Sequence, residues 1–312
     1  MKKKRRKGNI IIISGIISII IITIITFSKD NILYQYYKYN ITKNYSNINE
    51  NNYFLKDNFN YVENYTKPNI KNKQDLINSI YYSLNSGIKY TEKYIDKDYT
   101  NFINDIDNIT NNEKEKLQKQ ISLLNNFVHP YNSSNNINLT YGNKYMFSIT
   151  VNKAYTNKEI DEINTIVDKI INEKINNNMS DREKIKIIHD YIINNTEYDI
   201  LKNNNINDTT YKSNTAYGAL IEGYATCNGY SDAMAIFLNK LDIINYKISN
   251  DKHIWNLVYI DGKWYHLDLT WDDPISSANT TRDTYFLITT KELEEINDDT
   301  HKYEKTIYSE AS

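Results

Sequence analysis

The sequence has few of the residues that brace or restrict a chain: one cysteine, three prolines and eight glycines in 312 residues. A single cysteine excludes a disulfide within the chain and any metal site built from several thiolates. Nothing else in the sequence points to a cofactor, and no acidic loop of the Asp-x-Asp-x-Asp-Gly type indicates calcium. Hydrophobic residues make up 40% and charged residues 24%, which is typical of a globular protein.

The N-terminus combines a basic tail, residues 1–9, with an uncharged apolar run, Ile10–Phe27. A run of about 18–20 such residues spans a bilayer. The basic flank is expected to stay in the cytoplasm, which places the rest of the chain outside. The run ends Thr26-Phe27-Ser28 without the small residues of a cleavage site, so we predict an uncleaved anchor.

The charge balance changes across this predicted anchor. Removing the six basic residues of the tail from the 37 Lys and Arg leaves 31, against 39 Asp and Glu. The predicted outer part therefore carries a net charge of −8, and an acidic surface disfavours nucleic-acid binding.

The middle of the chain is expected to hold a linker and a small subdomain. Residues 28–71 are rich in Tyr and Asn with little periodicity, which suggests a stalk. Residues 72–152 predict an α/β subdomain with helices over 75–95 and 111–127, followed by a strand over 144–152.

Residues 153–312 are predicted to form the main domain. Two capping boxes, Thr156 with Glu159 and Ser180 with Glu183, predict the starts of two helices. From Thr215 onward the composition changes, because this part holds four of the eight glycines and all three tryptophans. We therefore look for chemistry there.

Cys227 precedes a helical pattern with small residues at 229, 231, 233 and 235, which places it in the first turn of a helix. Free backbone N–H groups and the helix dipole favour a thiolate at that end. The small residues predict close packing of this helix on a neighbouring sheet. A buried, inert cysteine is the alternative interpretation.

Two alternating segments, 252–260 and 263–271, flank Asp261-Gly262 and predict a hairpin with a two-residue turn. This register places His253, Trp255, Trp264, His266 and Asp268 on one face. His253 and Asp268 become diagonal neighbours, about 7–8 Å apart between backbones, which their side chains can bridge. His266 lies on the same face, so the register alone does not choose between the two histidines.

Several motifs in this part resemble the bacterial transglutaminase-like superfamily over about residues 156–293. The motifs are Tyr217-Gly218-Ala219-Leu220, Cys227-Asn228-Gly229-Tyr230, His253-Ile254-Trp255-Asn256 and the stretch from Trp264 to Pro274, with His189-Asp190-Tyr191-Ile192 before them. The resemblance implies a papain-like α+β core behind the N-terminal transmembrane helix, with the cysteine-bearing helix packed on an antiparallel sheet. It also implies a triad of Cys227, His253 and Asp268, which favours His253 over His266.

Other members of the site are less defined by the sequence. The Cys227 backbone N–H is a candidate oxyanion donor, with Tyr191 or Tyr217 as a second donor, and Trp255 is expected in the cleft. The remaining histidines are assigned no catalytic role. His189 is interpreted as a packing or hydrogen-bonding residue, whereas His129 and His301 have no partner in the sequence.

The expected function is thiol-dependent acyl transfer through an acyl-thioester, outside the membrane, on protein or peptide substrates that include cell-wall peptides. Water as acceptor would give peptidase or amidase action, and an amine would give crosslinking. Two alternatives remain open: a non-catalytic binding module of the same fold at the cell surface, and a redox sensor that uses the thiol alone.

Overall fold

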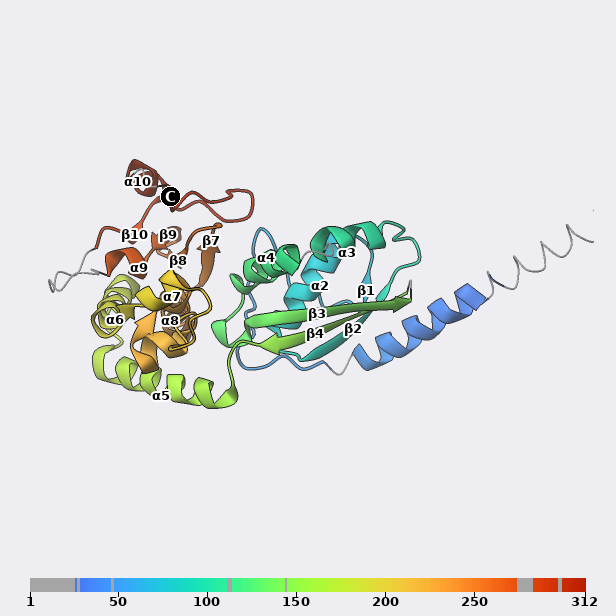
Figure 1. Ribbon diagram of the computed structural model, residues 1–312, viewed down its shortest axis with the longest axis horizontal. Helices are drawn as coiled ribbons and strands as arrows, with labels where there is room; N and C mark the ends of the chain where they lie inside the picture. Colours follow the sequence, from blue (N-terminus) through green and yellow to red (C-terminus); the bar gives the residue numbers. More distant parts are fainter. Residues whose placement is uncertain are drawn as a thin grey trace, which may run out of the picture.

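The computed structural model describes residues 26, 29–45, 48–110, 114–143, 145–273, 283–296 and 299–312. The chain forms two lobes in sequence order, each built around a four-stranded sheet (Figure 1). This mixed α+β architecture agrees with the predicted fold class. The predicted transmembrane segment, residues 10–27, lies outside the described residues except for residue 26. No helix within the described ranges is long and apolar enough to cross a membrane.

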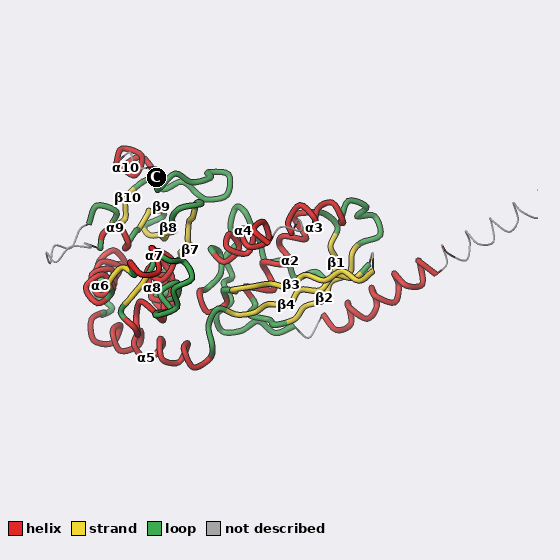
Figure 2. Tube along the Cα trace, in the orientation of Figure 1, coloured by secondary structure: helices red, strands yellow, loops and turns green. Residues whose placement is uncertain are grey.

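The N-terminal lobe has the strand order β1-β2-β4-β3, with helices on one side of the strands (Figure 2). Its elements are β1 (Asn69–Ile70), α2 (Lys73–Asn85), β2 (Tyr90–Ile95), α3 (Phe102–Thr110), α4 (Lys114–Asn125), η1 (Pro130–Asn132), β3 (Ser134–Asn143) and β4 (Met146–Lys153). The predicted helix over 111–127 and the predicted strand over 144–152 correspond to α4 and β4, while residues 111–113 and 144 lie outside the described residues.

The helix predicted over 75–95 is wrong in its second half. It ends at Asn85, and residues 90–95 form β2 instead. Gly87 adopts a φ of 67°, a left-handed conformation that ends a helix and that glycine accepts without strain. The four-residue spacing of Leu84 and Ile88 continues the helical pattern across this turn. Periodicity alone therefore predicts a helix that extends past its true C-terminus.

Residues 28–71 were expected to form a stalk, and their described part is more ordered than that. Residues 29–45 are helical and project from the end of the N-terminal lobe (Figure 1). Tyr34 of this helix packs edge-on against Tyr94 and Tyr145. Further on, Val62 and Ile70 are buried in the core of the lobe. Tyrosine rings supply much of this packing, and a search for periodic aliphatic residues does not detect them.

The C-terminal lobe has the strand order β10-β9-β8-β7 and a separate parallel pair, β5-β6. Its elements are α5 (Asn157–Lys174), α6 (Asp181–Asn195), β5 (Glu197–Tyr198), α7 (Ile200–Asn204), η2 (Gly218–Glu222), β6 (Tyr224–Ala225), α8 (Cys227–Lys240), β7 (Asn245–Ser249), β8 (Ile254–Ile260), β9 (Lys263–Leu267), α9 (Leu269–Asp272), β10 (Phe286–Ile288) and α10 (Thr290–Ile296). Both predicted capping boxes are present, at Thr156 and Ser180. The four main strands are antiparallel, and α8 packs on β7 and β8.

One of the apolar clusters in the described residues contains side chains from both lobes. Phe127, at the end of α4, lies with its ring 5.3 Å from that of Tyr246 and 5.6 Å from that of Tyr308. Beside this contact the Lys247 N–H donates to the Asn126 carbonyl at 2.9 Å. The end of α4 is therefore fixed next to β7, where it borders the start of α8. The predicted boundary between residues 152 and 153 stays a prediction.

Candidate active site

The β8–β9 hairpin has the predicted register. Ile260 pairs with Lys263, Tyr259 with Trp264 and Leu257 with His266. Asp261 and Gly262 have φ values of 52° and 78°, which fit the two-residue turn expected between the strands. The strands are shorter than predicted, however, because β9 ends at Leu267. Asp268 leaves the sheet there and caps the short helix α9 with its side chain.

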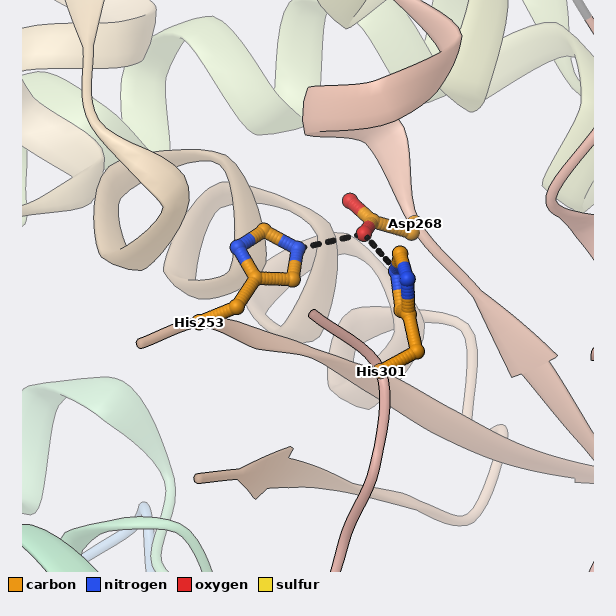
Figure 3. Close-up of side chains that lie close together, drawn as sticks. All are labelled: His253, Asp268 and His301. Carbon is orange, nitrogen blue, oxygen red and sulfur yellow. Dashed lines mark hydrogen bonds and ion pairs between the residues drawn. The ribbon is translucent and has the colours of Figure 1, made fainter. Parts of the chain in front are cut away.

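His253 and Asp268 form a buried pair at the open end of this hairpin. The His253 Nε2 donates to Asp268 Oδ2 at 2.5 Å. The two residues are only 8% and 2% exposed. Figure 3 shows that the second nitrogen of the His253 ring, Nδ1, points away from the carboxylate. Trp255 stacks on the imidazole, with ring centroids 5.7 Å apart and planes at 14°. These contacts fix the ring orientation.

Asp268 binds a third segment that the sequence did not predict. The His301 Nε2 donates to the same oxygen, Asp268 Oδ2, at 2.7 Å (Figure 3). The other oxygen, Oδ1, accepts the N–H groups of Thr270 at 2.9 Å and Trp271 at 3.4 Å. The expectation that His301 has no partner is therefore wrong. It lies 33 residues from Asp268 in the chain, and no local pattern marks the contact.

The electrostatics of this pair favour its charged form. Burial alone lowers the pKa of His253, but the charge and hydrogen bond of Asp268, followed by the Cys227 side chain, raise it to about 10. Burial alone would raise the pKa of Asp268, but His253 and His301 outweigh it and hold that pKa well below its usual range. An imidazolium beside a carboxylate is therefore the stable state at neutral pH.

Cys227 is the first residue of α8, as predicted, and its thiol is free and partly exposed. The Cys227 side chain is among the groups that raise the pKa of His253. Both residues line one cleft of about 580 Å³. Sites where a thiol meets a protonated imidazole at a helix N-terminus favour the nucleophilic thiolate.

The small residues of α8 contact more than the predicted sheet. The Ser231 hydroxyl lies 2.8 Å from the Cys227 carbonyl and 3.1 Å from the Ile254 carbonyl, which fixes the helix to β8. Gly229 instead faces the loop over residues 213–215. The cysteine is thus held from two sides.

Replacing Gly229 by alanine tests this close approach. An added Cβ would lie 2.3 Å from the Ser213 carbonyl oxygen and 3.0 Å from that of Thr215. Alanine normally stabilises a helix over glycine by about 0.5–1 kcal/mol. Here we expect the opposite sign, a loss of about 1–3 kcal/mol, because the backbone of α8 must move. Urea unfolding measures this, and a variant at least as stable as the native protein would contradict the contact.

The cleft lies where both lobes meet, and amides and hydroxyls dominate its lining. Examples are Gln118, Ser122 and Asn135 from the N-terminal lobe and Asn203, Asn214 and Asn228 from the C-terminal lobe. The acidic residue in the lining, Asp232, is ion-paired with Lys247. Lys202 and Lys252 also line the cleft, which is polar and suits the backbone and amide groups of a peptide.

The tyrosines proposed as oxyanion donors lie elsewhere. Tyr191 and Tyr217 do not line the cleft, and neither does Trp255, which was expected there but is buried behind His253. The Tyr217 hydroxyl donates to Glu162 at 2.8 Å, and the Tyr191 ring packs against Phe237. Tyr198, at β5, lines the cleft instead; burial first, and then the Cys227 charge, raise its pKa.

His266 has a separate set of partners. Its Nδ1 accepts the Trp255 indole N–H at 3.1 Å, and its Nε2 lies 3.1 Å from the Thr290 hydroxyl. Burial lowers the pKa of His266 to about 3, so this imidazole is neutral. The Trp255 indole thus binds one histidine while its face supports the other. Of the two candidates on this face, His253 is the one bonded to Asp268.

His189 and His129, which were assigned no catalytic role, are both buried. His189 is buried and joins Asp190 at 2.9 Å and Asp272 at 3.2 Å, which confirms its interpretation as a hydrogen-bonding residue. His129 accepts the Tyr131 backbone N–H at 3.2 Å, and burial lowers its pKa to about 3. Both histidines are buried and hydrogen-bonded within the fold.

Two groups of described residues bring three potential metal ligands together: His253, Asp268 and His301, and His189, Asp190 and Asp283. In the first, the carboxylate oxygen already accepts both imidazole N–H groups. In the second, Lys186 forms ion pairs with both carboxylates, and its charge opposes a cation. Both arrangements fit hydrogen-bonded networks.

The comparisons with known proteins concern the same region. Residues 168–269 match the model of the transglutaminase-like superfamily, a stretch that includes Cys227, His253 and Asp268. These residues are thus similar to that superfamily.

Two solved structures are similar to parts of the chain. One is a transglutaminase, 20% identical, over 49% of this chain and 48% of that one, with a TM-score of 0.33. The other is a candidate cysteine protease from Cytophaga hutchinsonii, 16% identical, over 43% and 61%, with a TM-score of 0.27. The chain thus spans about half the length of that transglutaminase. No curated protein matches the sequence.

Proposed function

We propose that the protein is a thiol-dependent acyltransferase or peptidase, with Cys227 as nucleophile, His253 as acid and base, and Asp268 as the group that orients His253. The observation that carries this proposal is the buried His253–Asp268 pair, whose imidazole lines the same cleft as Cys227 at the start of α8. The matched transglutaminase-like domain supports the same chemistry.

The reaction follows from the positions of these groups. The Cys227 thiolate attacks an amide carbonyl, and the imidazolium of His253 gives its proton to the departing amine. An acyl-thioester is left on the sulfur. His253, now neutral, takes a proton from water or from an amine acceptor, which attacks the thioester and releases the product. Asp268 keeps the ring in place through both steps and stabilises the imidazolium.

The substrate in this proposal is a protein or peptide amide, which the polar cleft at Cys227 suits. We place the reaction outside the cytoplasm, because a basic tail followed by an apolar run at residues 10–27 is the pattern of a membrane anchor. Cell-wall peptides are then within reach of the site, and nucleic acids are not expected partners.

The first test is the pH dependence of iodoacetamide alkylation in the full-length protein. Cys227 is the one cysteine, so the rate reports this thiol alone. Because the pKa of His253 is raised to about 10, its positive charge persists through neutral pH and supports the thiolate. We expect a rate nearly constant between about pH 6 and 9, whereas an ordinary thiol slows about tenfold per unit below about pH 8.5.

His253→Ala supplies the comparison, and its rate is expected to fall with decreasing pH like that of an ordinary thiol. His266→Ala is the matched control, since that imidazole is not bonded to Asp268, and it should keep the flat profile. If native protein and His253→Ala give the same profile, the activated pair is absent and a binding module becomes the better interpretation. Turnover is then measured with a glutaminyl peptide and a fluorescent primary amine, where amine dependence separates transfer from hydrolysis.

A further inference from the structure

His301 approaches the candidate active site from the C-terminal segment, residues 299–312, which follows α10. Its side chain is buried and lies among aromatic rings from three other segments. The ring stacks on Tyr285 with centroids 4.7 Å apart, and meets Trp255 and Trp271 edge-on at 4.9 and 5.5 Å. Its position relative to Asp268 is therefore fixed by packing as well as by the hydrogen bond.

The segment that carries His301 is tied to the backbone of His253. The Asn250 side-chain amide donates to the carbonyls of Thr300 at 2.6 Å and Lys302 at 2.7 Å, on either side of His301. The carbonyl oxygen of the same side chain accepts the His253 N–H at 2.9 Å. One asparagine thus sets the spacing between the two histidines that share Asp268.

Both nitrogens of the His301 ring have hydrogen-bond partners. Its Nε2 carries the proton donated to Asp268 Oδ2, and its Nδ1 lies 3.2 Å from the Thr300 hydroxyl, which can donate to it. With Thr270 and Trp271 on the other oxygen, the carboxylate accepts four N–H groups and has one orientation that satisfies all of them.

We propose that His301 is a positioning residue of the active site, which holds Asp268 Oδ2 in line with His253 so that the imidazole presents Nδ1 to Cys227. This inference rests on the proposed acyl-transfer function. Without the His301 donor, the carboxylate can turn about its remaining bonds and carry the His253 ring with it. Displacements of about 1 Å in such groups cost up to about 100-fold in rate.

A matched pair of variants separates positioning from packing. His301→Gln and His301→Met remove the same ring and have side chains of similar length, but only glutamine keeps an N–H donor. We expect His301→Met to lower kcat about 10- to 100-fold with KM within about twofold, because the substrate does not touch this residue. His301→Gln should recover most of that loss.

Equal kcat values for His301→Gln and His301→Met would overturn the proposal, since the donor would then have no effect. Should both variants unfold, His301→Phe keeps an aromatic ring without a donor, and native-like turnover in that variant would have the same meaning. The alkylation profile separates the two levels of failure. If His253→Ala changes the alkylation profile but the His301 variants keep native turnover, only the positioning role of His301 is rejected. A profile insensitive to His253→Ala rejects the proposed function, and the His301 role with it.

Discussion

Replacing Asp268 by asparagine is expected to lower kcat/KM of the proposed reaction by about 10³- to 10⁴-fold. Both carboxylate oxygens face N–H donors: the rings of His253 and His301 on one side and the α9 backbone on the other. An asparagine must turn its NH₂ group toward one of these sets. Either way donors face donors, and the neutral amide no longer supports the imidazolium. Steady-state kinetics on the glutaminyl peptide measure the loss.

Asp273→Asn is the control for this change, because it makes the same substitution nearby. Asp273 accepts a hydrogen bond from the Tyr230 hydroxyl, and an amide oxygen can accept the same bond. Its activity should stay within about threefold of native, since no imidazole depends on it. An Asp268→Asn protein as active as Asp273→Asn would remove Asp268 from the site.

The largest expected effect on stability belongs to Lys247. Its ammonium forms an ion pair with Asp232 in the lining of the cleft, and the two side chains are 3% and 2% exposed. Asp232 also accepts the Tyr155 hydroxyl at 2.6 Å. Lys247→Met leaves a buried carboxylate with that hydroxyl as its remaining side-chain partner. We expect a loss of about 3–5 kcal/mol in the free energy of unfolding, measured with urea.

Two further variants make this expectation specific. Lys240→Met breaks the pair with Asp168, whose side chains are each 49% exposed, and should cost no more than about 1 kcal/mol. In the double variant Asp232→Asn with Lys247→Met, the unpaired charge is gone. It should regain about 1–3 kcal/mol over Lys247→Met alone. If the two lysine variants cost the same, burial of the pair is not what makes it matter.

Much of the C-terminal lobe follows from short-range rules. The capping boxes at Thr156 and Ser180 place two helices, because the residues that satisfy the free N–H groups lie three positions apart. Asp261-Gly262 accepts the backbone conformation of a tight turn, and that turn sets the register of β8 against β9, which ends one residue before Asp268. By contrast, the helix predicted over 75–95 shows how a local pattern fails when a glycine turn interrupts an apolar spacing that continues.

The sequence by itself thus determined the Cys227 helix and the His253–Asp268 juxtaposition, because both depend on contacts set by local geometry. Only the tertiary structure decided the rest of the site. His301 reaches Asp268 because a distant segment packs across the sheet, and the end of α4 borders the cleft because Phe127 packs on Tyr246 and Tyr308. Tyr198 lines the cleft, whereas Tyr191 and Tyr217 do not, for a similar reason. Such contacts depend on how whole elements pack in the core, and no spacing along the chain encodes them.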